Sequence, residues 1–422
     1  MPRMNRRTLF GIAGAGAAAA AGAGAVLAAE HVLPASVGGG PDDVVPFRGA
    51  RQAGITTAAQ DHLYFVALDV TTTDRAELVD LLQRWTLAAE RLTTGAEVAV
   101  DGAIGGHPEA PPQDTGEALG LPPARLTLTF GVGPSLFTRD GVDRFGIADR
   151  RPPKLIDLPL FAGDAIEPGR SNGDLCIQAC ADDPQVAVHA VRNLIRMGFG
   201  TTAVRWAQMG YGRTSSTVVG QATPRNMFGF KDGTSNITAE DTAGLARHVW
   251  AAAEDGADWM TGGSYLVARR IRMAIEPWDR TSLLEQEEIV GRHKGSGAAL
   301  GATDEFAEVD FSATRPDGSG PLVGMDSHVR LAHSSTLGGV RILRRGYNFI
   351  DGTDAEGHLD AGLFFIAFVR DPGAQFVPMQ QALSTKDIMM EYLVHTSSAL
   401  FACPPGVGTG DHWGRTLFGN PA

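Results

Sequence analysis

The sequence is short of cysteine and has no excess of basic residues, and each shortage excludes a class of protein. Its 422 residues include only three cysteines, too few for a disulfide scaffold or for a zinc site with four cysteine ligands. Lysine and arginine total 36 against 48 aspartate and glutamate, for a net charge of −12, so nucleic acid is not an expected partner. Hydrophobic residues at 43% and charged residues at 20% are typical of a folded globular protein.

Several common catalytic motifs are also absent. The chain has no GxxxxGK[ST] phosphate loop, no HExxH zinc motif, no GxSxG nucleophile elbow and no CxxCH site for covalent haem. Gly131 and Gly133 follow an expected strand, but Leu136 stands where a dinucleotide-binding fingerprint requires a third glycine. Composition and motif spacing alone therefore indicate a folded protein without identifying its chemistry.

The N-terminus has the pattern of an export signal. Residues Asn5–Phe10 (NRRTLF) form a twin-arginine signature, and the run Gly11–Ala29 that follows is mostly alanine and glycine. Such a run is too weakly apolar to stay in a membrane as a helix. We expect a signal peptide and cleavage region over 1–35, with no stable membrane insertion after cleavage. The twin-arginine translocase is then a partner during export, and the mature protein is extracellular, in the cell envelope or periplasmic.

The cysteines that are present do not require a disulfide. Cys176 and Cys180 lie four residues apart in an expected strand, roughly 13 Å apart at ~3.3 Å per residue. A disulfide needs Cα atoms within about 7 Å. That pair cannot close in a strand, and Cys403 is left over.

Hydrophobic periodicity predicts short strands that alternate with helices. Strands are expected at 62–71, 125–132, 174–181, 202–209, 265–275, 341–349, 362–370 and 398–403, and helices at 74–92, 184–195, 280–291 and 379–393. Segments Asp174–Pro184 and Gly362–Pro372 match at four positions, and a helical run follows each. The fold class predicted is therefore α+β, with two similar halves (36–225 and 226–422), each an antiparallel sheet with its helices on one side.

One segment resembles a known family. Arg225–Asn236 (RNMFGFKDGTSN) contains Gly229-Phe230-Lys231-Asp232-Gly233, which resembles the GxxDG motif of dye-decolorizing peroxidases, a haem family with two ferredoxin-like halves. Further segments that resemble the family, in its order, are 46–55, 174–193, 278–294, 327–332 and 341–347. The resemblance covers about residues 46–407 and is closest to the twin-arginine-exported branch.

The resemblance implies haem b (iron protoporphyrin IX) in the C-terminal half, with His328 as the axial metal ligand. The second imidazole nitrogen should face an acceptor that raises the basicity of the ligand. Asp387 and Glu391 both remain candidates for this acceptor. His333, five positions after His328, is the nearest rival ligand.

Asp232 and Arg344 are implied on the opposite side of the haem as the catalytic residues. A carboxylate can move a proton from the inner to the outer oxygen of peroxide, and a guanidinium can stabilise the charge on the departing oxygen. Arg344 and Arg345 should point to opposite faces of a strand, and the family pattern favours Arg344. An unperturbed aspartate has a pKa of about 3.9 against about 6.5 for histidine, so we expect an acidic pH optimum.

Further residues receive supporting roles. Phe365 or Phe364 is expected to line the haem pocket, Arg330 to meet a haem propionate, and Asn236 to orient the motif loop beside the cofactor. Large dyes cannot enter a pocket sized for peroxide, so electrons should arrive through aromatic side chains. The candidates for this relay are Trp206, Tyr265, Trp278, Tyr347 and Trp413.

The function expected from this resemblance is an exported haem peroxidase. It would reduce hydrogen peroxide and oxidise aromatic electron donors (dyes and phenolics) through high-valent iron. One alternative is a deferrochelatase-like role in haem iron acquisition, in which haem is the substrate. Another is a non-catalytic haem or copper carrier that uses His328.

Overall fold

The computed structural model describes residues 43–419. The export signal and cleavage region predicted at 1–35 lie outside the described residues. Residues 44–61 form an N-terminal arm of turns and extended chain without a regular helix or strand. No helix within 43–419 has the length and apolarity needed to cross a bilayer.

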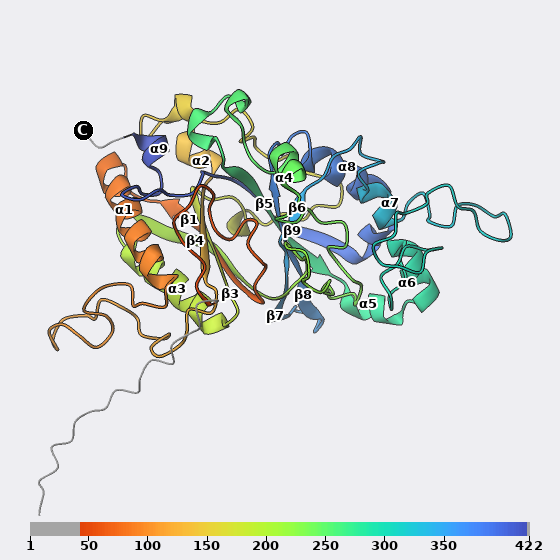
Figure 1. Ribbon diagram of the computed structural model, residues 1–422, viewed down its shortest axis with the longest axis horizontal. Helices are drawn as coiled ribbons and strands as arrows, with labels where there is room; N and C mark the ends of the chain where they lie inside the picture. The colour runs from red at the N-terminus through yellow and green to blue at the C-terminus, as the bar shows by residue number, and fades with distance from the viewer. Residues whose placement is uncertain (1–42, 420–422) are drawn as a thin grey trace, which may run out of the picture. The chain divides into compact units, whose positions relative to one another are not determined.

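Strands and helices alternate along the first half of the chain, whereas the second half has three successive helices followed by three successive strands (Figure 1). The first half contains β1 (His62–Val70), α1 (Arg75–Leu92), β2 (Thr127–Val132), α2 (Pro134–Phe137), β3 (Leu175–Ala181), α3 (Pro184–Met197) and β4 (Thr202–Arg213). The second contains α4 (Thr242–His248), β5 (Ser264–Met273), α5 (Ile275–Arg280), α6 (Leu283–Val290), α7 (His328–Ala332), β6 (Leu343–Arg344), β7 (Tyr347–Thr353), β8 (Leu359–Val369), α8 (Phe376–Lys386), β9 (Leu393–Cys403) and α9 (Arg415–Phe418).

All the strands of the described chain belong to one antiparallel sheet. Its order is β5-β9-β2-β3-β1-β4-β7-β8-β6, and β5 also pairs with β8, which closes the sheet. The first-half strands lie in the order β2-β3-β1-β4, and the second-half strands β7-β8-β5-β9 repeat that order. Few residues join the halves: Val132 pairs with Ala402 at one seam, and Tyr211 pairs with Asn348 at the other. The sheets expected for the two halves are therefore parts of one continuous sheet.

Alternation along the strands separates two apolar layers. On β1, Leu63 and Phe65 belong to a core cluster that also contains Phe364 of β8 and Phe401 of β9, so this cluster lies between the two halves. Val66 on the opposite face belongs to the cluster that includes residues of α1 and α3, which lie side by side over the first half (Figure 1). Strand β1 is thus covered by helices on one face and by the second half on the other, whereas Val204 and Met209 of β4 are exposed.

Three predicted elements differ from the structure. The strand expected at 341–349 is interrupted, because Arg345 and Gly346 separate β6 from β7. The helix expected at 280–291 begins at Leu283, where Ser282 Oγ accepts a hydrogen bond from the Glu285 amide at 3.2 Å. The helix expected at 379–393 ends at Lys386, and a 3₁₀ turn follows from Ile388. This last break matters for the site described below. The three cysteines are free and buried, as the sequence predicts.

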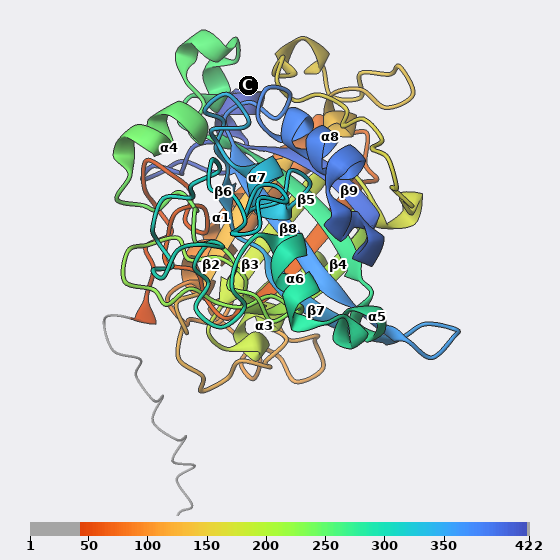
Figure 2. The same cartoon turned by 90° about the vertical axis from the view of Figure 1, so that its right-hand side faces the viewer.

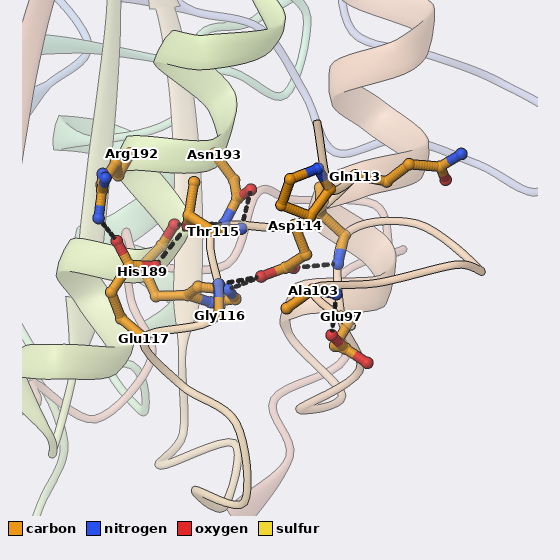
Figure 3. A network of polar contacts seen from close by, with 12 residues as sticks. Glu97, Ala103, Gln113, Asp114, Thr115, Gly116, Glu117, His189, Arg192 and Asn193 are labelled. Atoms are coloured by element: carbon orange, nitrogen blue, oxygen red, sulfur yellow. Dashed lines mark hydrogen bonds and ion pairs between the residues drawn. The ribbon is translucent and has the colours of Figure 1, made fainter. Parts of the chain in front are cut away.

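A long loop between α1 and β2 is fastened to α3 by a polar network (Figure 3). Asp114 Oδ1 lies 2.7 Å from His189 Nε2, and Asp114 Oδ2 accepts the Val98 amide at 2.7 Å. The Asn193 side chain donates to Thr115 Oγ1 at 2.8 Å. The Asp114 side chain is fully buried and that of His189 is 7% exposed. The network fixes the loop without contributing to the candidate site.

Candidate functional site

Four segments of the second half carry the residues that the sequence singles out. His328 begins α7, Asp387 follows the end of α8, Asp232 lies in the loop before α4, and Arg344 ends the two-residue strand β6. Figure 2 shows α7 beside α8 and close to β6. The fold therefore gathers residues separated by more than 150 positions in the sequence.

His328 has one ring nitrogen fixed and the other free. Its Nδ1 lies 2.6 Å from Asp387 Oδ2. Its Nε2 has no hydrogen-bond partner among the described residues, and 32% of the side chain is exposed against 1% for Asp387. A carboxylate on Nδ1 fixes the tautomer and directs the Nε2 lone pair outward. His328 is thus prepared to act as a metal ligand through Nε2.

Three charged residues act on the pKa of His328. Burial lowers the pKa of the imidazole, but Asp387, and beyond it Asp232, raise the pKa more, while Arg344 lowers it. The net result is a raised pKa. Because Asp232 and Arg344 both act on this pKa, their charges lie within electrostatic range of the imidazole.

The structure resolves the choice between Asp387 and Glu391. Asp387 occupies the break between α8 and the following 3₁₀ turn, where its Oδ1 accepts the Met389 amide at 2.9 Å. The other oxygen is thereby aimed at His328. Glu391 is exposed and makes no contact with His328. The sequence suggested a continuous helix here, so it could not separate the two acids.

Asp232 and Arg344 are in direct contact. Arg344 Nη1 donates to Asp232 Oδ1 at 2.5 Å. Asn226 Nδ2 donates to the second oxygen, Asp232 Oδ2, at 3.3 Å. Asn226 is a residue that sequence reasoning missed, although it lies six positions before the aspartate in the same matched segment.

The glycine after Asp232 has a steric reason. Gly233 has a φ of +88°, and a Cβ there would lie 2.8 Å from the Ser215 Cα. Other residues would strain the backbone and displace the loop. Gly233 therefore helps to set the direction of the Asp232 side chain.

Arg345, which follows the last residue of β6, makes its contacts with residues of the N-terminal arm instead of with Asp232. Its guanidinium donates to the Thr57 carbonyl at 2.5 Å and contacts Gln60, and its side chain is completely buried. The expectation that only one of the two arginines joins Asp232 is therefore met by Arg344.

Asn236 holds the backbone of Arg344. Its Oδ1 accepts the Arg344 amide at 2.7 Å, and its Nδ2 donates to the Arg344 and Ser216 carbonyls, both at 2.9 Å. These bonds occupy both ends of the side-chain amide. The structure therefore places Asn236 as a support for Arg344, and a direct contact with a cofactor stays a prediction.

Arg330 is largely engaged with its own loop. Its Nε and Nη2 donate to the carbonyls of Val323, Gly324 and Phe311 at 2.7–3.1 Å. The guanidinium also lies 4.6 Å from the centre of the Phe311 ring. The predicted propionate contact would have to use the remaining nitrogen, Nη1.

The two phenylalanines of β8 lie on opposite faces of the sheet. Phe364 is fully buried in the layer between the halves, with its ring 5.4 Å from that of Phe65, so it does not line the pocket. Arg344 pairs with Ala367, and Phe365, two residues away, shares that face. Phe365 is partly exposed, which keeps it as the candidate.

His333 lacks the features of an axial ligand. Its Nδ1 lies 2.7 Å from Ser335 Oγ, and its ring packs edge-on against Phe311 at 5.0 Å. Burial lowers its pKa, and no carboxylate contacts the ring. His328 remains the candidate ligand.

A haem fits the donor set better than a bare metal ion. The described chain contains no group of three or more His, Cys, Asp or Glu side chains able to hold a metal. A metal at His328 must therefore bring most of its ligands with it, as iron in a porphyrin does. An imidazole with a free Nε2, backed by a carboxylate and facing an aspartate–arginine pair, meets the requirement for such a group.

Comparison with known proteins gives a consistent result. Family models described as Dyp-type peroxidase, N-terminal and C-terminal, match residues 52–212 and 223–408. A protein of Escherichia coli (strain K12) named deferrochelatase is 34% identical over 422 residues, which is 98% of this chain and 96% of that protein. A deferrochelatase of Yersinia pseudotuberculosis is 35% identical over 374 residues, 87% of this chain and 83% of that protein.

A solved structure agrees with the sequence relatives. The DyP-type peroxidase from Streptomyces coelicolor superposes with a TM-score of 0.80 at 35% identity, covering 89% of this chain and 97% of that one. The match extends over both halves. The chain therefore belongs to the dye-decolorizing (DyP-type) peroxidase family and is a haem-dependent peroxidase.

Proposed function

We propose that the protein is an exported haem b peroxidase that reduces hydrogen peroxide with electrons from aromatic donors such as dyes and phenolics. The observation that carries the proposal is the placement of Asp232 and Arg344 in contact with each other and within electrostatic range of an imidazole whose Nε2 is free. Export through the twin-arginine translocase, to the cell exterior, envelope or periplasm, rests on the sequence of residues 1–35.

The haem, when bound, supplies an iron that accepts oxidation by peroxide and is then reduced by donors. His328 would hold it through Nε2, and Asp387 keeps the proton of the imidazole on Nδ1. Asp232 takes the proton from one peroxide oxygen and returns it to the other, which leaves as water. Arg344 stabilises the negative charge that develops on the leaving oxygen.

The supporting residues keep this pair in place. Asn226 fixes the second oxygen of Asp232, so the carboxylate cannot rotate freely. Asn236 fixes the backbone of Arg344. Because the proton acceptor is an aspartate, we propose an acidic pH optimum, with the peroxide rate falling at a midpoint below about pH 6.

The route of electrons from large donors needs a surface residue. Trp206, Tyr265, Trp278, Tyr347 and Trp413 are all buried, with at most 7% of each exposed. They can pass electrons only from another side chain or from a small donor that penetrates the protein. Tyr211, 39% exposed at the end of β4, is available for the outer step.

A second function is favoured by the relatives. Two proteins 34–35% identical to this chain are named deferrochelatase, so removal of iron from haem is the competing activity. Membership of a peroxidase family favours either enzyme over a non-catalytic carrier.

The repeated strand order supports the finer description of the fold. We assign the halves, placed by sequence at 36–225 and 226–422, as ferredoxin-like, because β2-β3-β1-β4 and β7-β8-β5-β9 follow one pattern. Each half then contributes a sheet with two main helices.

One experiment separates the two activities. The holoprotein is mixed with hydrogen peroxide and an anthraquinone dye, and dye absorbance and the fluorescence of metal-free porphyrin are followed together. If the protein is a peroxidase, it bleaches the dye and releases no porphyrin. The Asp232→Asn variant then reacts with peroxide about 10²–10⁴-fold more slowly than the parent. Porphyrin release at the rate of turnover, without dye oxidation, would establish the deferrochelatase activity instead.

A further inference from the structure

The long connection between α6 and α7 reaches back to the loop that carries Asp232. Arg225, at the start of that loop, donates to the Lys294 carbonyl at 2.6 Å and to the Gly295 carbonyl at 2.9 Å. Arg292 donates to the Glu305 carbonyl at 3.1 Å. The Arg225 side chain therefore ties the loop that carries Asp232 to the main chain of the connection, and the Arg292 side chain braces the connection internally.

Glu305 is the side chain at the centre of this contact. One carboxylate oxygen, Oε2, forms an ion pair with Lys231 Nζ, and the other, Oε1, accepts from Thr234 Oγ1 at 3.1 Å. Its side chain is only 10% exposed. Glu305 thus binds the residue immediately before Asp232 and the residue two positions after it.

Glu305 and Lys231 are both charged although both side chains are largely buried. Burial raises the pKa of Glu305, but hydrogen bonds from Lys231, Thr223 and Thr234 outweigh burial and lower it. Glu305 is therefore ionised at neutral pH and neutralises an ammonium that is itself only 26% exposed. Without Glu305, Lys231 would hold an unpaired charge in a partly buried site, which is unfavourable.

Asp232 directly follows Lys231 in the sequence. The Asp232 carboxylate is held by Arg344 and Asn226, and a second cation competing for it would draw it from Arg344. An opposite charge at close range also makes a carboxylate a weaker base. An unpaired Lys231 would therefore impair proton transfer in two ways. It would draw Asp232 away from Arg344, and it would make Asp232 a weaker base.

We infer that Glu305 is a positioning residue that retains the Lys231 ammonium away from Asp232, so that Asp232 stays paired with Arg344 and competent as a base. The inference rests on the proposed role of Asp232. It assigns to the α6–α7 connection a direct part in the peroxide step.

The test is a double-mutant cycle in the haem-loaded protein with Glu305→Gln, Lys231→Met and the combination of both. Two rates are measured: reaction with hydrogen peroxide, and binding of cyanide followed by absorption, because hydrogen cyanide must also lose a proton to a nearby base. Glu305→Gln is expected to slow both about tenfold, since a close opposite charge shifts a carboxylate pKa by about one unit or more. Lys231→Met alone stays within about twofold of the parent, and the double variant recovers to within about threefold.

Glu308→Gln is the matched control, because Glu308 lies in the same connection, is exposed, and does not contact Lys231. It should leave both rates unchanged. A double variant as slow as Glu305→Gln, or a Glu305→Gln protein as fast as the parent, would overturn the inference. An Asp232→Asn protein with unchanged rates would instead overturn the role of Asp232, and the inference with it.

Discussion

The hydrogen-bonded pairs Asp114–His189 and Asp387–His328 differ in what the second ring nitrogen can reach. In the first half, His189 uses Nε2 to meet Asp114 at 2.7 Å, and its side chain is 7% exposed (Figure 3). In the second half, His328 uses Nδ1 to meet Asp387 at 2.6 Å, and its side chain is 32% exposed. The contact distances are nearly equal, so the aspartate does not distinguish the pairs.

The surroundings make the difference. Asp114 also accepts hydrogen bonds from the amides of Val98 and Gly116. The Asp114–His189 pair therefore holds the loop between α1 and β2 in place. Asp387 has one oxygen on a backbone amide and one on His328, which leaves Nε2 of His328 without a hydrogen-bond partner among the described residues. A histidine with a carboxylate partner is therefore a ligand candidate only when its remaining nitrogen faces open space.

The largest effect on activity is expected when the histidines of the two pairs are replaced. His328→Ala removes the axial ligand and should lower peroxidase activity by at least about 100-fold, because even loss of a ligand's outer partner costs 10–100-fold. His189→Ala should leave activity per bound haem unchanged. The measurements are the haem absorption spectrum and the rate of dye oxidation. Equal losses in both variants would contradict the assignment of His328.

An intermediate effect is expected at the aspartates. Asp387→Asn keeps the shape but weakens the acceptor on Nδ1, and should lower haem affinity or activity about 10–100-fold. Asp114→Asn should instead lower the free energy of unfolding by about 2 kcal/mol, because it weakens hydrogen bonds to a buried charge. Haem titration and thermal unfolding on both proteins separate the two outcomes. A reversed pattern would show that the roles of the pairs are exchanged.

The smallest expected effect is the pH dependence of the stability that the Asp114–His189 pair contributes. Burial raises the pKa of Asp114, but the Val98 amide, His189 and the Gly116 amide lower it more, so the folded-state pKa lies below the usual value. A depressed carboxyl pKa stabilises the fold above the unfolded-state pKa, and the contribution disappears as the pH falls through the folded-state value. The difference in Tm between the parent and Asp114→Asn should be constant near pH 6 and shrink below about pH 4. A gap that widened in acid would refute this account.

The sequence predicts much of the fold because periodicity reports burial locally. The strands at 62–70, 175–181 and 359–369 and the helix at 75–92 are close to their expected positions. Closure of the sheet was not predictable, since the pairing of β5 with β8 depends on residues almost a hundred positions apart. The break at Asp387 was missed because an aspartate inside an apparent helix gives no sign that it caps a new turn.

The site was predictable only in part and through resemblance. His328, Asp232 and Arg344 lie in segments that match the family, and strand alternation separated Arg344 from Arg345. The roles of Asn226 and Glu305 were not predicted, because they arise from contacts that local spacing does not encode. The choice between Phe364 and Phe365 stayed open, since two adjacent aromatic residues in a strand give no indication of which faces the core.

In the proposed ligation of haem iron by His328, the position of Asp387 just beyond the end of α8 couples that whole helix to the iron. Any shift of α8 along or about its axis changes the strength of the bond to His328 Nδ1, and through it the electron density that the imidazole offers to iron. The reduction potential of the cofactor should therefore respond to how α8 packs on the sheet, which makes Phe376 and Met379, buried beneath that helix, remote determinants of the redox chemistry.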